Sequence, residues 1–208
     1  MGRLTLIALV APGPAPGTWV RSSGERDTRQ VLTVTRLSAA ERELGSLRFL
    51  RAWQLSSPNS YFDSYSALVS LGEGRLLAAS DKGAMLLFSM ADSTVAPRFD
   101  YFAGHRPAAK RFADLEALTR DPESGRLWAA YELANRIERV EGDFTGSRVV
   151  RPPAMQHWPE NSGAEAMVRL ADGRFIVLAE AKLRWGRTTT PALLFPSDPI
   201  EGAPPIEF

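Results

Sequence analysis

The apolar residues of this chain occur in short runs that are separated by turn-forming residues. The same order of features appears three times: an apolar run, a turn and a second apolar run, at 65–88, 114–140 and 163–182. The runs are short, and glycine, proline and aspartate interrupt them, so the pattern favours strands over helices. Both faces of the third hairpin are largely apolar, whereas a sheet with one solvent-exposed face would alternate apolar and polar residues. We therefore predict an all-β chain whose hairpins are buried on both faces.

The three stretches repeat at a nearly constant interval. Ala67, Ala117 and Ala166 occupy equivalent places and are 50 and 49 positions apart. A period of this size is typical of propellers and solenoids. A third strand is predicted after each hairpin ("GAMLLFS", "NRIERVEG" and "TTTPALLF"), and a fourth at "PRFDYFAG" and "GSRVVRPP". Four short strands in about fifty residues describe a blade of a β-propeller. A generic β-sandwich is the alternative, but it does not require a repeat.

The number of blades follows from the phase of the repeat. The segment "SLRFLRAWQL" (46–55) has the pattern of a fourth strand, because Phe49 lies fifty positions before Phe99. The chain ends at "PPIEF", about where the outer strand of the third copy would lie. We therefore predict about three full blades plus a lent outer strand, which is an incomplete ring. The expected organisation is a signal peptide at 1–20, an extension with a short strand at 21–45 and a partial propeller at 46–208. The incomplete ring suggests the N-terminal part of a longer protein; a short protein that assembles its ring from two chains is the alternative. Open blade edges would favour self-association.

The turns predict which residues face each other across each hairpin. Asp172-Gly173 is a strong signal for a two-residue turn, and centring the third hairpin there also places Met167 opposite Leu178 and Val168 opposite Val177. The end away from the turn then carries a polar pair in every copy. In a propeller these ends lie on one face, so five carboxylates would gather at one rim near the channel. The predicted pairs are Ser66 with Asp81, Glu116 with Glu132, and Glu165 with Glu180.

Opposed carboxylates need a partner, because like charges across a strand pair are destabilising. Hard cations such as calcium take six to eight oxygen ligands, often carboxylates. Two close carboxylates can instead share a proton, which raises one pKa into a range useful for acid–base catalysis. The structural alternative is that each glutamate accepts hydrogen bonds from the adjacent blade. The candidate metal ligands are Asp81, Glu116, Glu132, Glu165 and Glu180.

Basic residues follow the second-strand acids closely. Lys82, Arg136 and Lys182 could hold a phosphate group, or they could pair with the carboxylates. His157 lies in the loop that leads into the third hairpin, and we include it as a candidate substrate-binding residue, with an ordinary surface histidine as the alternative.

Composition and charge exclude several classes of protein. The chain has 25 basic and 24 acidic residues, which argues against nucleic-acid binding by bulk charge. It has no cysteine, which excludes disulfide frameworks and thiolate metal sites. No apolar run is long enough to span a bilayer as a helix. The first eleven residues, with one arginine and a short apolar core, are typical of a weak secretory signal, so we expect a periplasmic or secreted protein; an apolar first strand is the alternative.

The repeats resemble a phytase-like family described as having esterase-like activity. The matching segments are "LRFLRAWQL" with "YSALVSLGEGRLLAASDKG", then "DLEALTRDPESGRLWAAYE", then "NSGAEAMVRLADGRFIVLAE", within residues 46–208. The resemblance implies an exported bacterial β-propeller that hydrolyses small-molecule phosphoesters or esters, and the related alkaline phytases use calcium. The first copy departs from the pattern, with Ser66 where later copies have Glu116 and Glu165. The alternative function is a non-catalytic propeller that binds a ligand or a protein partner.

Overall fold

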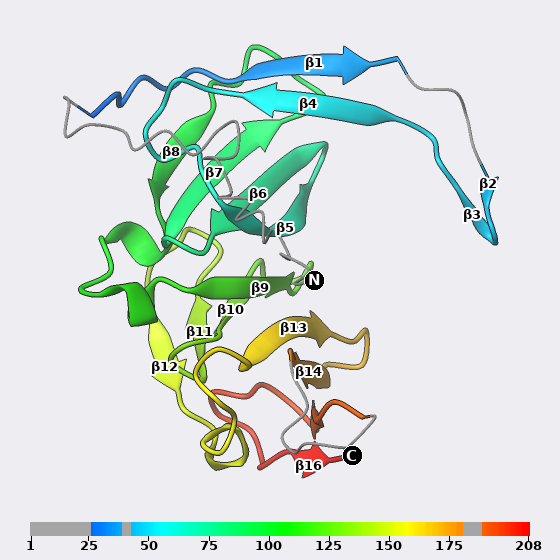
Figure 1. Ribbon diagram of the computed structural model, residues 1–208, viewed down its shortest axis with the longest axis vertical. Coiled ribbons are helices and arrows are strands. Elements are labelled where there is room, and N and C mark those ends of the chain that lie inside the picture. Colours follow the sequence, from blue (N-terminus) through cyan, green and yellow to red (C-terminus); the bar gives the residue numbers. More distant parts are fainter. Residues whose placement is uncertain (1–25, 39–42, 181–188) are drawn as a thin grey trace, which may run out of the picture.

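The computed structural model describes residues 26–38, 43–180 and 189–208. In this part of the chain the regular structure is antiparallel β-sheet, apart from three single-turn 3-10 segments (Figure 1). The first four-stranded sheet is formed by β5 (Tyr65–Gly72), β6 (Arg75–Ser80), β7 (Ala84–Ser89) and β8 (Arg98–Tyr101). The second is formed by β9 (Leu115–Arg120), β10 (Leu127–Tyr131), β11 (Arg136–Val140) and β12 (Arg148–Val150). The third is formed by β13 (Ala164–Arg169), β14 (Phe175–Ala179), β15 (Ala192–Phe195) and β16 (Ile206–Glu207). The 3-10 segments are η1 (Phe102–Gly104), η2 (Lys110–Phe112) and η3 (Pro153–Met155).

The three sheets are stacked blades. Each sheet runs in chain order from its first to its fourth strand, and the first strands β5, β9 and β13 contact one another in succession. Figure 1 shows the blades following one another down the long axis of the molecule. This confirms the predicted β-propeller blades, with the first strand of each innermost. The described sheets do not close into a ring.

Apolar side chains fill the two spaces between the blades. Between the first and second blades, Leu77 and Met85 meet Leu115 and Leu127, and all four are essentially inaccessible to solvent. Between the second and third blades the core is larger and includes the aromatic pair Trp128 and Phe175, whose ring centroids lie 4.9 Å apart. Burial on both faces is why these strands read as nearly continuous apolar runs.

A two-stranded ribbon covers the outer face of the first blade. It is formed by β1 (Thr33–Leu37) and β4 (Ala52–Ser56), with a small hairpin of β2 (Glu43–Leu44) and β3 (Leu47–Arg48) extending from it (Figure 1). Leu32 and Leu55 pack against the cluster around Phe88 and Phe99. The predicted strand at 46–55 is thus divided between β3 and β4.

The first and third hairpins, both predicted to have two-residue turns, close with loops of different length. Gly72 pairs with Arg75, so Glu73 and Gly74, both with positive φ, form the two-residue turn expected of the first hairpin. In the third hairpin the Leu170 carbonyl accepts a hydrogen bond from the Gly173 N–H, and Gly173 has φ 88°. This is a three-residue loop, so the two-residue turn predicted at Asp172-Gly173 is wrong.

The longer loop and a β-bulge change the facing pairs. Met167 lies opposite Val177, and Val168 lies opposite Ile176, one residue away from the predicted register. A bulge, in which one strand carries an extra unpaired residue, then falls at Glu165. In all three blades the bulge occurs at the equivalent position of the first strand, so the residues of the three predicted polar pairs do not lie directly opposite each other. The bulged residues are Ser66, Glu116 and Glu165.

No helix in the described residues is long and apolar enough to cross a membrane.

Candidate functional site

The bulged end of the blades carries a group of acidic residues. In each blade, the residue just after the second strand donates its backbone N–H to a carbonyl just before the first strand, which closes that end of the hairpin. The pairs are Asp81 to Ser64 at 3.1 Å, Glu132 to Asp114 at 3.0 Å, and Glu180 to Gly163 at 2.9 Å. The equivalent positions thus come together in each blade, although they are not ladder partners.

The second blade forms the tightest part of this group. Asp114 precedes β9, Glu116 is the bulged residue of β9, and Glu132 follows β10. Carboxylate oxygens of these three residues all lie within 4.8 Å of one another. Asp114 is buried, whereas Glu116 and Glu132 are half-buried. We call these three residues the acidic cluster.

The electrostatics of the cluster reflect burial and like charge. Burial raises the pKa of Glu116 to about 7, and Glu165 on the next blade is the next contributor. Burial and the neighbouring Asp114 raise the pKa of Glu132 to about 7. Burial and Glu180 raise the pKa of Glu165. Carboxylates that are partly desolvated and close to one another resist ionisation in this way.

The neighbouring blades contribute the remaining carboxylates. Asp81 from the first blade raises the pKa of both Glu116 and Asp114, after larger effects of burial. Glu165 and Glu180 from the third blade raise the pKa of Glu132, again after burial. The structure therefore brings the five predicted carboxylates into one region of negative potential.

Sequence reasoning missed Asp114. When the repeats are aligned on their alanines, the acidic residue at the entry to β9 is Glu116, which lies two residues after Asp114. The signal was available, because Asp114 has the same phase as Ser64 and Gly163, 50 and 49 positions away. Its role depends on the bulge, which allows Asp114 and Glu116 to share one small region.

The glutamates do not bridge the blades within the described structure. That role belongs to Ser66, whose hydroxyl donates to the Leu115 carbonyl of the next blade. Among the described residues, the salt bridges and side-chain hydrogen bonds to backbone include neither Glu116 nor Glu165. Glu116 is half-buried at its bulge and Glu165 is exposed at its own.

Close packing at Gly163 positions Glu132 relative to the third blade. A Cβ atom at Gly163 would clash with the backbone carbonyl of Glu132 and with the side-chain oxygen of Asn135. Asn135 in turn donates to the Trp158 carbonyl at 2.8 Å. Glycine is thus required where the turn of the second blade meets the entry of the third.

A family model described as "Phytase-like: Esterase-like activity of phytase" matches residues 20–208. The chain belongs to the phytase-like family. No functionally curated protein gave a significant match.

Solved structures similar to this phytase-like chain include the WD40 β-propeller domain of Doa1, with 13% identity, a TM-score of 0.43, and coverage of 64% of this chain and 38% of the other. The hemopexin-fold protein CP4 from cow pea has 11% identity and a TM-score of 0.43, covering 69% and 65%. YCF48 bound to D1 peptide has 14% identity and a TM-score of 0.44, covering 74% and 44%. The chain thus spans less than two thirds of each of these matched structures.

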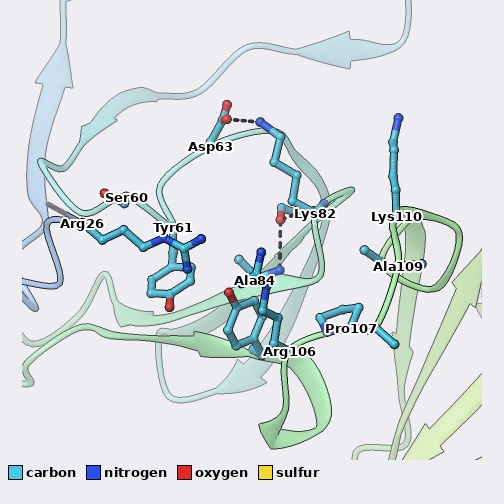
Figure 2. A pocket seen from close by; sticks show the side chains of 14 residues that line it. Arg26, Ser60, Tyr61, Asp63, Lys82, Ala84, Arg106, Pro107, Ala109 and Lys110 are labelled. Carbon is cyan, nitrogen blue, oxygen red and sulfur yellow. Dashed lines mark hydrogen bonds and ion pairs between the residues drawn. The ribbon is translucent and has the colours of Figure 1, made fainter. Parts of the chain in front are cut away.

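The predicted basic residues have different surroundings in this phytase-like chain. Lys82 forms an ion pair with Asp63, and both residues line a pocket (Figure 2). Arg136 stacks on the Tyr131 ring at 4.0 Å and donates to the Phe112 carbonyl at 2.9 Å. It also pairs with Glu138 at 3.4 Å, so these contacts direct its guanidinium to partners other than the acidic cluster. His157 is exposed in a turn after η3, and Lys182 lies outside the described residues.

The acidic cluster suits a hard divalent cation. Its donors are carboxylate oxygens, the ligands that calcium and magnesium prefer. No salt bridge within the described residues neutralises Asp114, Glu116 or Glu132. Three carboxylates held this closely resist simultaneous ionisation unless they share protons or bind a cation. The cluster could therefore hold a metal ion.

Proposed function

We propose that this chain takes part in the hydrolysis of a small-molecule ester, either a phosphoester or a carboxylic ester, at the acidic rim with the help of a divalent cation such as calcium. The observation that carries the proposal is the group of three carboxylates within 4.8 Å at the bulged end of the second blade. Family membership supports it, because the family description refers to esterase-like activity of phytase.

Asp114, Glu116 and Glu132 would hold the cation. Their oxygens are already close together, and the buried Asp114 is fixed by the hairpin end where its carbonyl accepts the Glu132 N–H. Asp81 and Glu180 add negative charge around the cluster without belonging to its closest group. A bound cation would supply Lewis-acid polarisation of a phosphoryl or carbonyl oxygen.

Glu165 is the proposed proton carrier. Its side chain is largely exposed at the bulge, and partial burial and the charge of Glu180 raise its pKa, so that its carboxylate accepts a proton more readily than that of an isolated glutamate. In hydrolysis a water oxygen bonds to phosphorus or to the carbonyl carbon, and the bond from that atom to the ester oxygen breaks. One proton of the water moves to the Glu165 carboxylate and then to the departing alkoxide, which releases the alcohol and the acid and regenerates the carboxylate.

The test compares hydrolysis with and without the cation. Chelator-treated protein is assayed with para-nitrophenyl phosphate and para-nitrophenyl acetate before and after calcium or magnesium is added. We expect cation-dependent release of nitrophenol, and at least a tenfold loss in Glu116→Gln, which removes a ligand charge at constant shape. The matched control is Glu123→Gln, an exposed glutamate in the loop between β9 and β10. No cation-dependent hydrolysis of either compound would contradict the proposal.

We also propose export to the periplasm or the medium, which rests on the charge and apolar pattern of residues 1–11. Expression in a Gram-negative bacterium and sequencing of the mature N-terminus test this. Retention of Met1 in a cytoplasmic product would contradict it.

A further inference from the structure

Exposed apolar side chains gather at the two ends of the blade stack. Among the described residues, twelve large hydrophobic side chains are exposed, and one of them, Val149, belongs to the second blade. Four lie in the third blade, and seven lie in the first blade or in the N-terminal ribbon and its flanking residues. Figure 1 shows the ribbon at one end of the stack and β16 at the other. Apolar surface concentrated in this way marks sites of interaction.

The outer face of the third blade is an apolar strip that crosses all four strands. Residues of the strip lie opposite one another from each strand to the next. The alternate residues Met167, Val177 and Leu193 pack against the second blade, so the strip is directed away from it. We call this strip the third-blade face, and it consists of Val168, Ile176, Leu178, Leu194 and Ile206.

A groove of about 380 Å³ lies at the opposite end of the stack, between the ribbon and the first blade. One face of the ribbon forms one wall, because Arg36 lies opposite Trp53 and two positions after Val34. The end of β7 and the loop that follows it form the other wall. We call this the first-blade groove, and the residues that line it include Val34, Arg36, Trp53, Phe88, Met90 and Val95.

The ribbon leaves the inner part of the same blade face open. Leu68 of β5 lies opposite Ala78, which belongs to the apolar cluster under the ribbon. Leu68 is nevertheless 62% exposed. The first blade therefore presents a second uncovered apolar surface, which extends from the groove at its outer edge to its innermost strand.

The two surfaces occupy matching places in the blade repeat. The described blades pack in succession through their first strands, β5 with β9 and β9 with β13. Another blade packed in the same way on the third-blade face would place its loop between third and fourth strands next to the start of β16. In the first blade this is the β7–β8 loop, which borders the groove. The first blade of a second copy would thus continue the stack and bring its groove to Ile206.

Unpaired charges beside the two surfaces have opposite sign. Arg36 lines the groove, which no carboxylate lines, and the Arg51 guanidinium lies 5.6 Å from the centre of the Trp53 ring. Glu207 is exposed on the outermost strand of the third blade. The salt bridges of the described residues include none of these three charged side chains. This complementarity favours contact between unlike ends of two copies over contact between like ends.

We propose that two copies of this chain form a closed ring of six blades, in which the third-blade face of each copy packs on the first-blade groove and the open face around Leu68 of the other. The inference goes beyond the proposed hydrolysis and does not depend on it. Head-to-tail contacts of this kind form a closed ring when their rotation closes, and six blades, three from each copy, fall within the usual four to eight of a propeller. Because every blade keeps its orientation, the acidic rims of both copies would lie at one end of the ring.

Sedimentation of the full chain and of two surface variants tests this arrangement. The wild type should have twice the mass of one chain. Leu178→Lys places a charge on the third-blade face and Trp53→Lys places one in the groove, so each variant alone should have half the wild-type mass. An equal mixture of the two variants should recover a two-chain species, because one variant retains an intact groove and the other an intact third-blade face.

The matched control is Val149→Lys, because Val149 is 47% exposed on the second blade; this variant should keep the two-chain mass. Should Leu178→Lys fail to fold by circular dichroism, Ile206→Lys replaces it, since Ile206 is 65% exposed. A monomeric wild type would overturn the inference, whether another segment or another protein covers these surfaces. A two-chain species that survives Trp53→Lys would overturn it as well, since like ends would then meet. Wild-type assemblies larger than two chains would contradict closure by two copies.

Discussion

Removing one carboxylate of the acidic cluster should stabilise the cation-free protein at alkaline pH. The change is Glu116→Gln, which keeps the shape of the side chain and removes its charge. In the folded chain the pKa of Glu116 is about 7, against an ordinary value of 4.5. Ionising it therefore costs more in the folded state than in the unfolded state, and the free energy of unfolding falls as pH rises from about 4.5 through 7.

The size of the effect follows from the same values. A rise in the pKa of Glu116 from 4.5 to about 7 lowers the free energy of unfolding at high pH by at most about 3.4 kcal/mol. Glu116 is only half-buried, so solvent screening reduces this to about 1 kcal/mol. For a chain of this length that is about 2–4 °C in the melting temperature.

The assay is thermal unfolding followed by tryptophan fluorescence, in chelator, at about pH 4 and about pH 8. We expect Glu116→Gln to melt above the wild type at the higher pH and to match it at the lower pH. In excess calcium the order at high pH should reverse, because the wild type gains more from the bound cation. A variant that melts at or below the wild type in chelator at high pH would refute the reasoning, and Glu123→Gln should show no difference in any condition.

Three further results are expected from other parts of the fold. Gly163→Ala should lower the free energy of unfolding by about 1–3 kcal/mol in chemical denaturation, because the new methyl group meets the fixed Glu132 carbonyl; unchanged stability would show that this contact is not tight. Arg139→Leu should cost about 3–5 kcal/mol, since it leaves Asp198 without its buried partner, and a loss below about 1 kcal/mol would place the pair among weak surface bridges. The chain should self-associate through the apolar outer face of the third blade, where Val168 is 46% and Leu178 41% exposed; light scattering should show a smaller particle for Leu178→Lys, and a monomeric wild type would contradict this.

The repeat carried most of the information about the fold. The spacing of Ala67, Ala117 and Ala166 located the first hairpin of each blade and the order of strands in it, because strands buried on both faces leave a plain apolar signature. Turn length was less certain, since Glu73-Gly74 and Asp172-Gly173 look alike in sequence yet close loops of two and three residues.

The candidate site was predicted only in part. The acidic rim itself followed from the repeat, but the bulges at Glu116 and Glu165 did not, because an extra residue is visible only when both strands are paired. Asp114 was missed for that reason. The direction of Arg136 could not be predicted either, because it depends on the ring of Tyr131, which lies five residues earlier on another strand. The first-blade groove combines residues from distant segments that no single motif unites.

Binding of calcium to chelator-treated protein, measured by titration calorimetry, tests the central claim most directly. We expect a saturable heat in the wild type and in Glu123→Gln, and a loss of at least tenfold in affinity in Asp114→Asn and in Glu116→Gln, since each removes one anionic ligand. If neither calcium nor magnesium produces a binding heat with the folded wild type, the assignment of the acidic cluster as a cation site is contradicted.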